Sequence, residues 1–385
     1  MRAVVVIPTY NEKENIGPLI EAIQKEFKKS PNNFKNHILV VDDSSPDGTA
    51  KEAKKKQKKF KNVHLLSNPK KEGLGGAYLK GMSYAVDKLK ADVLMQFDAD
   101  FSHDPKRIPE FLKAINNGSD MVLGSRYIKG GTIPDDWGFH RKFLSFFGNW
   151  TIRVVMTYFS IHDWTTGYRA IKKEVFRSVK NELNKERFFG YTFQIGFLHK
   201  AIRKGYKVSE VPINFIDRTI GKSKLGPEYV KNTLIYIIKT RIGEIMKSRI
   251  FKFAFVGGVG ALVQISTLQL YRSLFPFQIA FFLAIESAVA SNFIFNNIWT
   301  FSDRKLKAVQ IPKKFVQFNI ASAGSIIIQQ IVALIGENTV GLVPLFVVPV
   351  ISFNFDTGTL YAVLGILIGM FWNFFAYNKF IWKKK

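Results

Sequence analysis

The chain has 385 residues and no cysteine, which excludes disulfide bridges and gives no indication of an oxidising compartment. Its formal net charge of +26 indicates an anionic partner, such as a nucleic acid, a lipid surface or a phosphorylated substrate. Residues 1–250 are charged whereas residues 251–380 are strongly apolar, so we expect a soluble domain followed by a membrane domain.

Apolar, β-branched runs alternate with helix patterns through the first half. We predict strands at Ala3–Ile7, His37–Val41, Val63–Ser67, Val93–Phe97 and Met121–Ser125. This order is typical of an α/β domain with a parallel, doubly wound sheet. The glycine run Gly73–Ala77 departs from the dinucleotide spacing, so we interpret it as a tight helix entry. The first strand lacks the features of a signal peptide, and we expect membrane attachment to come from the C-terminal half.

Two polar loops follow the first two predicted strands. In the first, the Tyr10 ring can stack on a base and Glu12 can accept a hydrogen bond from it. In the second, Asp42 and Asp43 stand where carboxylates can bind the ribose hydroxyls or the base amino group of a nucleoside. The alternative for the second loop is an Asp-Gly turn with Thr49 as a helix cap.

Two carboxylates, Asp98 and Asp100, follow the predicted strand Val93–Phe97. They are two residues apart, so we expect their side chains to point the same way, into the crevice where open α/β sheets bind ligands. Two close carboxylates favour a hard divalent cation, Mg²⁺ or Mn²⁺, which is commonly shared with substrate phosphates. The alternative is a solvated acidic turn.

Basic residues follow the carboxylates. Arg126 ends a predicted strand, so we expect it to project into the same crevice, where it is either unpaired or holds a phosphate. A helix predicted to start near His140 carries Arg141 and Ser145 in its first turns and aromatic residues after them. This arrangement predicts a phosphate-binding corner beside an apolar surface, and the alternative for Arg141 is simple surface charge.

Four strings in order, VVVIPTYNE, VVDDSSPDGT, QFDADFSHDP and VLGSRYIKGG, resemble the family 2 glycosyltransferases of GT-A fold. Within that family the chain is most similar to enzymes that transfer mannose to polyprenyl phosphates. The resemblance implies a metal site at Asp98 and Asp100, with Ser102 as a weak third ligand where some relatives carry Gln. It also implies a nucleotide-sugar pocket lined by Pro8, Tyr10, Glu12, Val41, Asp42, Asp43, Asp98, Ala99 and Asp100.

The same resemblance assigns roles to residues further along the chain. It implies that Arg126, Arg141 and Ser145 contact the acceptor phosphate, and that Arg126 acts with Asp98 and Asp100 in catalysis. The loop Asp163–Arg169 would lie beside the sugar, where hydroxyls and an aromatic ring can position a hexose. Arg218 and Lys224 would contact the donor diphosphate from a loop that closes over it.

The C-terminal half begins with a predicted helix, Glu228–Arg249, whose apolar stripe contains Arg241, so we expect it to lie at the headgroup level. We therefore divide the chain into a catalytic domain (1–226), an interfacial helix (227–249) and an all-α transmembrane domain (250–385). Four apolar stretches in the last domain are long enough to span a bilayer: Phe251–Arg272, Phe277–Phe301, Phe315–Gly336 and Thr357–Phe380.

Basic residues gather in three clusters that four spans place on one side, with Arg272 as the exception. The positive-inside rule predicts that this side, and the catalytic domain with it, is cytoplasmic. Asn292-Phe293 recurs as Asn373-Phe374, which predicts two copies of a helical hairpin with an insertion around Gly341–Asp356. This half resembles the GtrA-like membrane domain. Asn side chains in the spans either link helices or line a path for lipid, and we favour the first.

The resemblance implies a metal-dependent, inverting transfer of mannose from GDP-mannose to dolichyl or another polyprenyl phosphate, at the cytoplasmic face of a lipid bilayer. Transfer of glucose from UDP-glucose and translocation of a lipid-linked sugar are the alternatives. A processive polysaccharide synthase would carry a Gln-x-x-Arg-Trp element, which the sequence lacks. Nucleic acid is not an expected partner, because it would not explain an acidic crevice.

Overall fold

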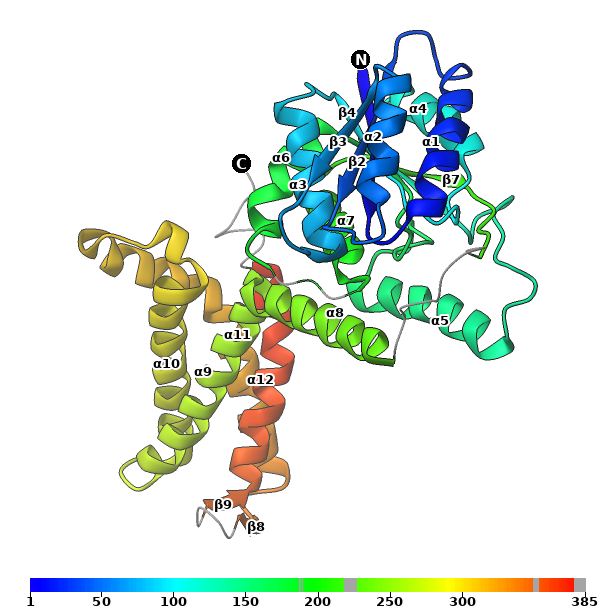
Figure 1. Cartoon of the computed structure of the whole chain (residues 1–385). Coiled ribbons are helices and arrows are strands. Elements are labelled where there is room, and N and C mark those ends of the chain that lie inside the picture. Colours follow the sequence, from blue (N-terminus) through cyan, green and yellow to red (C-terminus); the bar gives the residue numbers. More distant parts are fainter. Residues whose placement is uncertain (187, 189, 218–226, 349–352, 377–385) are drawn as a thin grey trace. The chain divides into compact units, whose positions relative to one another are not determined.

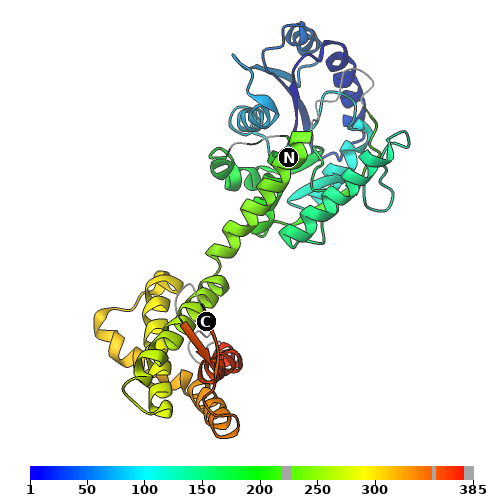
Figure 2. The same ribbon diagram turned by 90° about the horizontal axis from the view of Figure 1, so that it is seen from below.

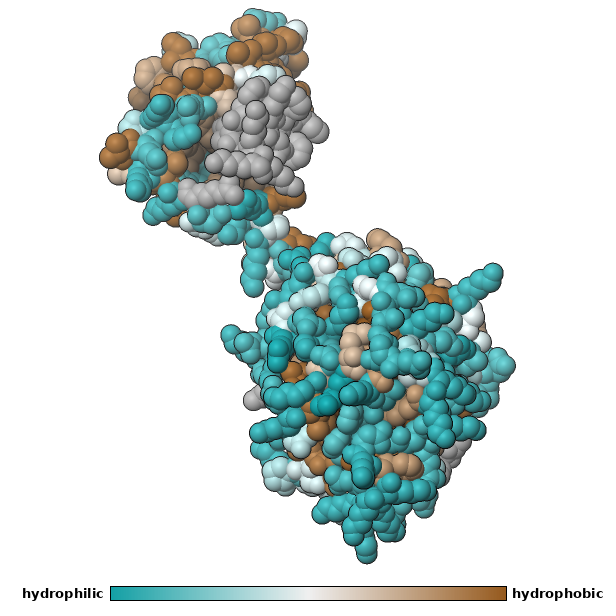
Figure 3. All heavy atoms as spheres, turned by 90° about the horizontal axis from the view of Figure 1, so that it is seen from above, coloured by the Kyte–Doolittle hydropathy of each residue, from teal (hydrophilic) through white to brown (hydrophobic). Residues whose placement is uncertain are grey.

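The structure is a computed structural model that describes residues 1–186, 188, 190–217, 227–348 and 353–376. The chain divides into two compact units, residues 1–241 and residues 242–385 (Figure 1). Figure 3 shows hydrophilic side chains over most of one face of the N-terminal unit and many hydrophobic side chains on the C-terminal unit. The two surfaces therefore differ in the way that the composition change predicts.

The N-terminal unit is built on a seven-stranded sheet in the order β3-β2-β1-β4-β6-β5-β7. Its strands are β1 (Arg2–Thr9), β2 (Lys35–Asp42), β3 (Val63–Ser67), β4 (Val93–Gln96), β5 (Met121–Ser125), β6 (Arg169–Lys172) and β7 (Val208–Pro212). The five predicted strands are confirmed, and β6 and β7 are additional. The five predicted strands run in the same direction, as expected, but the sheet is mixed, because β6 runs antiparallel to both β4 and β5.

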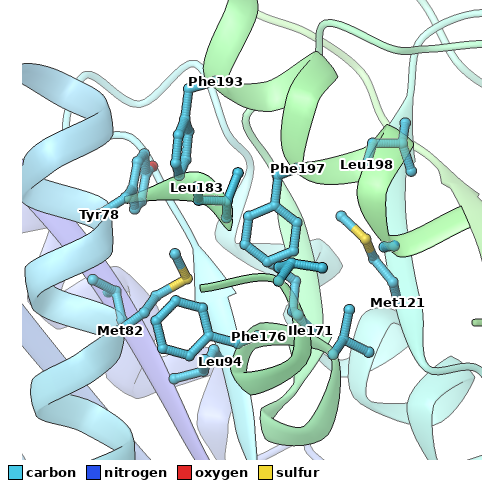
Figure 4. Close-up of a cluster of buried hydrophobic side chains, with 14 of the residues drawn as sticks. Tyr78, Met82, Leu94, Met121, Ile171, Phe176, Leu183, Phe193, Phe197 and Leu198 are labelled. Atoms are coloured by element: carbon cyan, nitrogen blue, oxygen red, sulfur yellow. The ribbon is translucent and has the colours of Figure 1, made fainter. Parts of the chain in front are cut away.

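Helices cover both faces of this sheet, as the doubly wound pattern predicts. They are α1 (Lys13–Phe27), α2 (Thr49–Lys59), α3 (Gly73–Asp87), α4 (Ile108–Asn116), α5 (Phe139–Met156), α6 (Lys173–Leu183) and α7 (Thr192–Arg203). Along β1, Val4 and Val6 belong to a core that also contains residues of α3, α6 and α7, whereas Val5 and Ile7 belong to a second core that contains residues of α1 and α4. The first of these cores contains Tyr78, which packs against the ring of Phe193 (Figure 4).

Two helices of this unit present apolar side chains to solvent. Phe143 and Phe147 of α5 are exposed, as are Leu234 and Ile238 of α8 (Pro227–Lys247). The predicted stripe of α8 is not uniform, because Ile237 is fully buried in the core of the N-terminal unit. The two views of the ribbon place α5 and the first part of α8 on the same side of this unit (Figures 1 and 2).

The C-terminal unit is mainly helical. It contains α9 (Arg249–Arg272), α10 (Phe277–Phe295), a π-helical turn (Asn296–Thr300), α11 (Ile311–Thr339) and α12 (Thr357–Ala376). In the described part of the chain, three helical segments are long and apolar enough to cross a membrane: Arg249–Arg272, Phe277–Thr300 and Ala308–Thr339. The fourth predicted span starts at Thr357 as expected, and its predicted end lies outside the described residues.

The segment predicted as an insertion contains an antiparallel pair of strands, β8 (Pro344–Val348) and β9 (Phe353–Asp356), so the unit is not entirely α-helical. Arg272, the exception to the one-sided basic clusters, is paired with Asp356 at the start of α12. Polar side chains also link the helices. Gln264 donates to Gln329 at 2.9 Å, whereas the linking role that we favour for the Asn side chains of the spans stays a prediction.

Candidate active site

The candidate site lies at the edge of the sheet where β1, β2, β4 and β5 have their carboxyl ends. The strand order reverses between β1 and β4, because β2 and β3 lie on one side of β1 and all later strands lie beyond β4. Ligands of open α/β sheets bind at such a switch point. Antiparallel β6 begins at the same edge, since Arg169 pairs with Gln96, so the loop before β6 also reaches the site.

Asp98 and Asp100 both follow β4 at this edge. Oδ1 of Asp98 accepts a hydrogen bond from the Tyr78 hydroxyl at 2.9 Å, and Oδ1 of Asp100 accepts one from the Ser102 main-chain N–H at 3.1 Å. Phe101, which stands between Asp100 and Ser102, adopts a left-handed conformation with φ of 60°. This turn directs the Ser102 N–H back toward Asp100.

This carboxylate pair fits a hard divalent cation that is shared with a phosphorylated ligand. In the described residues, no group of three or more His, Cys, Asp or Glu side chains is placed to hold a metal without help. A cation at Asp98 and Asp100 would therefore complete its coordination with substrate phosphate and water, which is the usual arrangement for Mg²⁺. Ser102 is buried beside Asp100, and its role as a third ligand stays a prediction.

The two acidic residues at the carboxyl end of β2, Asp42 and Asp43, are buried and bonded to protein groups. Asp42 accepts from the Thr9 hydroxyl at 3.3 Å. Asp43 accepts from the Asn68 amide at 2.8 Å and from the main-chain N–H groups of Glu72 and Gly73 at 2.8 and 3.0 Å. Asp43 therefore connects the end of β2 to the glycine-rich entry of α3. Its predicted contact with a nucleotide would come in addition to this structural role.

The loop after β1 lies against the loop after β2. The Glu12 main-chain N–H donates to the Thr49 hydroxyl at 2.9 Å, so Thr49 links the two loops. The alternative in which Thr49 caps its own helix is wrong, because the N-cap is Gly48. The Tyr10 ring lies under the Lys71 ammonium, 3.6 Å from the ring centroid. Pro8 pairs with Val41 in the sheet, and the Val41 side chain is fully buried in the core, so only its main chain can face a ligand.

Arg126 does not stand free in the crevice, so the expectation of an unpaired arginine is wrong. Its Nε and Nη2 donate to the two oxygens of Asp163 at 2.7 and 2.8 Å, and Nη2 also donates to the Thr165 hydroxyl at 2.8 Å. Burial disfavours the charge on Arg126, but the Asp163 carboxylate outweighs this effect, and the pKa of the guanidinium is raised. The loop before β6 thus holds this arginine in place.

Arg141 and Ser145 lie in the first turns of α5, as predicted. Arg141 donates to both oxygens of Asp217 at 2.7 and 3.0 Å and lies over the Trp137 ring. The Ser145 hydroxyl bonds the Tyr127 hydroxyl. The side chains that follow on α5 are exposed aromatics, so the charged corner does adjoin an apolar surface.

Tyr191 shows that these charges share one environment. Burial raises the pKa of the Tyr191 phenol, the positive charges of Arg126 and Arg141 lower it, and the carboxylates Asp98 and Asp163 raise it. All four charged groups therefore lie within electrostatic range of one side chain at the start of α7. The sequence reasoning missed Tyr191, since a lone tyrosine before a helix carries no motif.

The loop before β6 is built differently from the prediction. Its aromatic residues Trp164 and Tyr168 are fully buried, so neither ring is placed to position a hexose. Arg169 is also fully buried and donates to the main-chain carbonyls of Trp164, Thr166 and Gln194. Burial lowers the pKa of Arg169 to about 9. This residue fixes the loop that supplies Asp163, a role that the sequence motif did not reveal.

Two of the predicted donor contacts, Arg218 and Lys224, lie outside the described residues. Two site residues that the sequence reasoning did not single out are Tyr78 and His103. Tyr78 looked like an ordinary buried position of α3. His103 follows the carboxylates in the sequence, and its Nδ1 accepts a hydrogen bond from the Asp98 main-chain N–H at 3.0 Å.

Comparison with known proteins gives matches over both units. Residues 4–180 match the model of glycosyl transferase family 2, and residues 252–382 match the model of the GtrA/DPMS transmembrane domain. A dolichol-phosphate mannosyltransferase of Pyrococcus furiosus is 35% identical over 334 residues, which are 86% of this chain and 90% of that protein.

Two further relatives match the first part of the chain. A polyprenol monophosphomannose synthase of Mycolicibacterium smegmatis is 38% identical over 237 residues, which are 61% of this chain and 85% of that protein. An undecaprenyl-phosphate mannosyltransferase of Micrococcus luteus is 34% identical over 239 residues, which are 62% of this chain and 93% of that protein. The three names differ in the lipid and agree in the sugar.

Proposed function

The chain is a glycosyltransferase of family 2 with a GtrA-type membrane domain, and on this basis we propose that it transfers mannose to a polyprenyl phosphate. The observation that carries the proposal is the match to a dolichol-phosphate mannosyltransferase over both units, at 35% identity and over 86% of this chain. The other two relatives, named for different polyprenyl lipids, support mannose as the sugar and leave the lipid chain open.

GDP-mannose is the donor that we propose. The loops after β1 and β2 supply Tyr10 as a stacking surface and Glu12, Asp42 and Asp43 as acceptors, which suits a nucleoside. The buried hydrogen bonds of Asp43 hold the entry of α3 near this pocket.

Asp98 and Asp100 would hold Mg²⁺ or Mn²⁺, which supplies charge neutralisation for the leaving diphosphate. The acceptor is a phosphate monoester that is largely ionised near neutral pH, so no residue of this chain needs to act as a strong general base. The side chains have to align the acceptor oxygen with the anomeric carbon and keep the leaving group opposite it. Such a direct displacement inverts the configuration at the anomeric carbon.

We assign the acceptor phosphate to the corner formed by Arg126, Arg141 and Ser145. The exposed aromatic side chains that follow on α5, among them Phe143 and Phe147, suit the polyprenyl tail and the apolar layer of a lipid surface. The exposed apolar residues of α8 suit the same surface. We place this unit on the cytoplasmic side, because the positive-inside rule assigns that side to the basic clusters that flank the spans.

The test is a transfer assay with the full chain in detergent. Radiolabelled GDP-mannose and UDP-glucose are offered separately to a short polyprenyl phosphate, with and without EDTA, and Asp100→Asn serves as the inactive control. We expect mannosyl lipid from GDP-mannose that EDTA abolishes. Label that moves only from UDP-glucose would overturn the choice of sugar, and transfer that survives EDTA would overturn the metal site. No transfer from either donor would refute the proposal that polyprenyl phosphate is the acceptor.

A further inference from the structure

Two side chains to which the sequence analysis assigned no role, Tyr78 and His103, contact Asp98. Tyr78 reaches it from α3, and the phenol donates to Oδ1 at 2.9 Å. The Tyr78 ring is fully buried and lies parallel to the ring of Phe193, at an interplanar angle of 1°. Because the ring is packed on all sides, the hydroxyl has a fixed position, and the carboxylate oxygen that it contacts is fixed with it.

His103 contacts the same residue from the other direction. Its Nδ1 accepts the Asp98 main-chain N–H, so in the neutral ring the proton is on Nε2. Nε2 lies 3.6 Å from Oδ2 of Asp98, the oxygen that Tyr78 does not contact. The His103 ring is held by stacking on Tyr168, with ring centroids 4.9 Å apart, and by the edge of Phe97.

Space beside Oδ2 is kept open by a glycine. A Cβ atom on Gly167 would lie 3.2 Å from Oδ2 of Asp98 and 3.3 Å from Cε1 of His103. Three separate segments, α3, the loop after β4 and the loop before β6, therefore meet at this one carboxylate. A carboxylate that served only as a solvated turn would need none of them, because the terminal torsion of aspartate is broad and easily reoriented.

We propose that Tyr78 and His103 are positioning residues that fix the Asp98 carboxylate in the orientation that binds the metal-bound donor diphosphate. The inference rests on the proposed function. A carboxylate that is already oriented loses less conformational freedom when the cation and diphosphate bind, so both bind more tightly.

The experiment compares Tyr78→Phe with a matched control, Tyr236→Phe. Tyr236 also donates to a carboxylate, Glu186, at 2.9 Å, but it lies on α8. Full-length protein in detergent is titrated with Mn²⁺ in the presence of saturating GDP, and free Mn²⁺ is followed by electron paramagnetic resonance. Steady-state kcat and KM for GDP-mannose are measured on the same preparations.

We expect Tyr78→Phe to weaken the apparent Mn²⁺ affinity at least about tenfold and to raise KM for the donor, since it removes a hydrogen bond to a charged group. Tyr236→Phe should bind Mn²⁺ as the wild type does. Equal Mn²⁺ affinity of Tyr78→Phe and wild type, or an equal loss in both variants, would overturn the inference while the proposed function stood. A wild type that binds no Mn²⁺ with GDP would overturn both.

A second variant applies the same test from the other side. In His103→Asn the amide oxygen can replace Nδ1 as acceptor for the Asp98 N–H, but the variant loses Nε2, which lies 3.6 Å from Oδ2 in the wild type. We expect the loop to stay folded and Mn²⁺ affinity with GDP to fall. If Tyr78→Phe does not fold, this variant decides the question, and unchanged Mn²⁺ binding by it contradicts the inference.

Discussion

Arg126 and Asp163 form a bidentate ion pair in which Nε and Nη2 of the guanidinium lie 2.7 and 2.8 Å from the two carboxylate oxygens. Asp163 is fully buried, and the Arg126 side chain is almost so. The pair joins the end of β5 to the loop before β6, at the edge of the sheet that carries Asp98. The ion pair therefore fixes the Arg126 guanidinium at the edge of the sheet where Asp98 and Asp100 lie.

Arg126→Lys should lower the rate of transfer at least about tenfold, because an ammonium cannot make two parallel bonds to Asp163 and a third to Thr165. The matched control is Arg107→Lys, since Arg107 makes a single bond to Glu110 at 2.8 Å in an exposed pair. Initial rates and unfolding temperatures of both variants are measured together. A wild-type rate for Arg126→Lys would show that transfer does not need the two parallel hydrogen bonds to Asp163.

Gly167→Ala should reduce transfer about tenfold with little change in unfolding temperature. The added methyl group would lie 3.2 Å from Oδ2 of Asp98, closer than carbon and oxygen usually approach, so the carboxylate has to shift. Gly257→Ala is the control, because a Cβ atom there has no described neighbour within 4 Å. If Gly167→Ala retains full activity, the position of Asp98 is less restricted than the structure implies.

Replacing Phe143 and Phe147 by Ser should raise KM for a long polyprenyl phosphate at least about tenfold, since each exposed ring loses its burial against lipid. The rate with a short isoprenyl phosphate should change little, because that acceptor does not reach along α5. Transfer is measured in liposomes with acceptors of both lengths. An equal loss with both would indicate damage to the phosphate corner and not to a lipid contact.

His37 and His64 form a stacked pair with Nδ1 and Nε2 3.1 Å apart. Burial, with the nearby charge of Arg2, lowers the pKa of both rings. In the folded protein the two rings therefore resist protonation, whereas in the unfolded chain they take up a proton near the ordinary histidine pKa of about 6.5. The contribution of the two neutral rings to the stability of the folded protein is complete above about pH 6.5 and is lost as the pH falls below that value.

The N-terminal unit should therefore unfold at a lower temperature at pH 5 than at pH 7. Part of this decrease should disappear when both rings are replaced, in His37→Gln/His64→Gln. Scanning fluorimetry across this pH range measures the slope for each protein. An unchanged slope in the double variant would assign the decrease to carboxylates elsewhere.

Most of the sheet could be predicted because β1, β2 and β4 each contain a run of apolar residues that is buried on both faces, namely Ala3–Ile7, Ile38–Val41 and Val93–Met95. β6 could not, since it is four residues long and contains Arg169 and Lys172. The motif carboxylates could be placed because the strand before them fixes their direction. The partner of Arg126 could not, because Asp163 is 37 residues away and reaches it only through the antiparallel β6.

In the structure, Arg141 is already paired with a carboxylate of the protein, Asp217. Both oxygens of Asp217 accept from Arg141, and one of them also accepts from the Trp137 ring N–H. If the acceptor phosphate binds at Arg141 as proposed, it brings close to two negative charges and competes with this single carboxylate. Transfer of the sugar leaves a phosphodiester with one charge, which competes less well, so Asp217 would regain Arg141 after each turnover and help the product to depart.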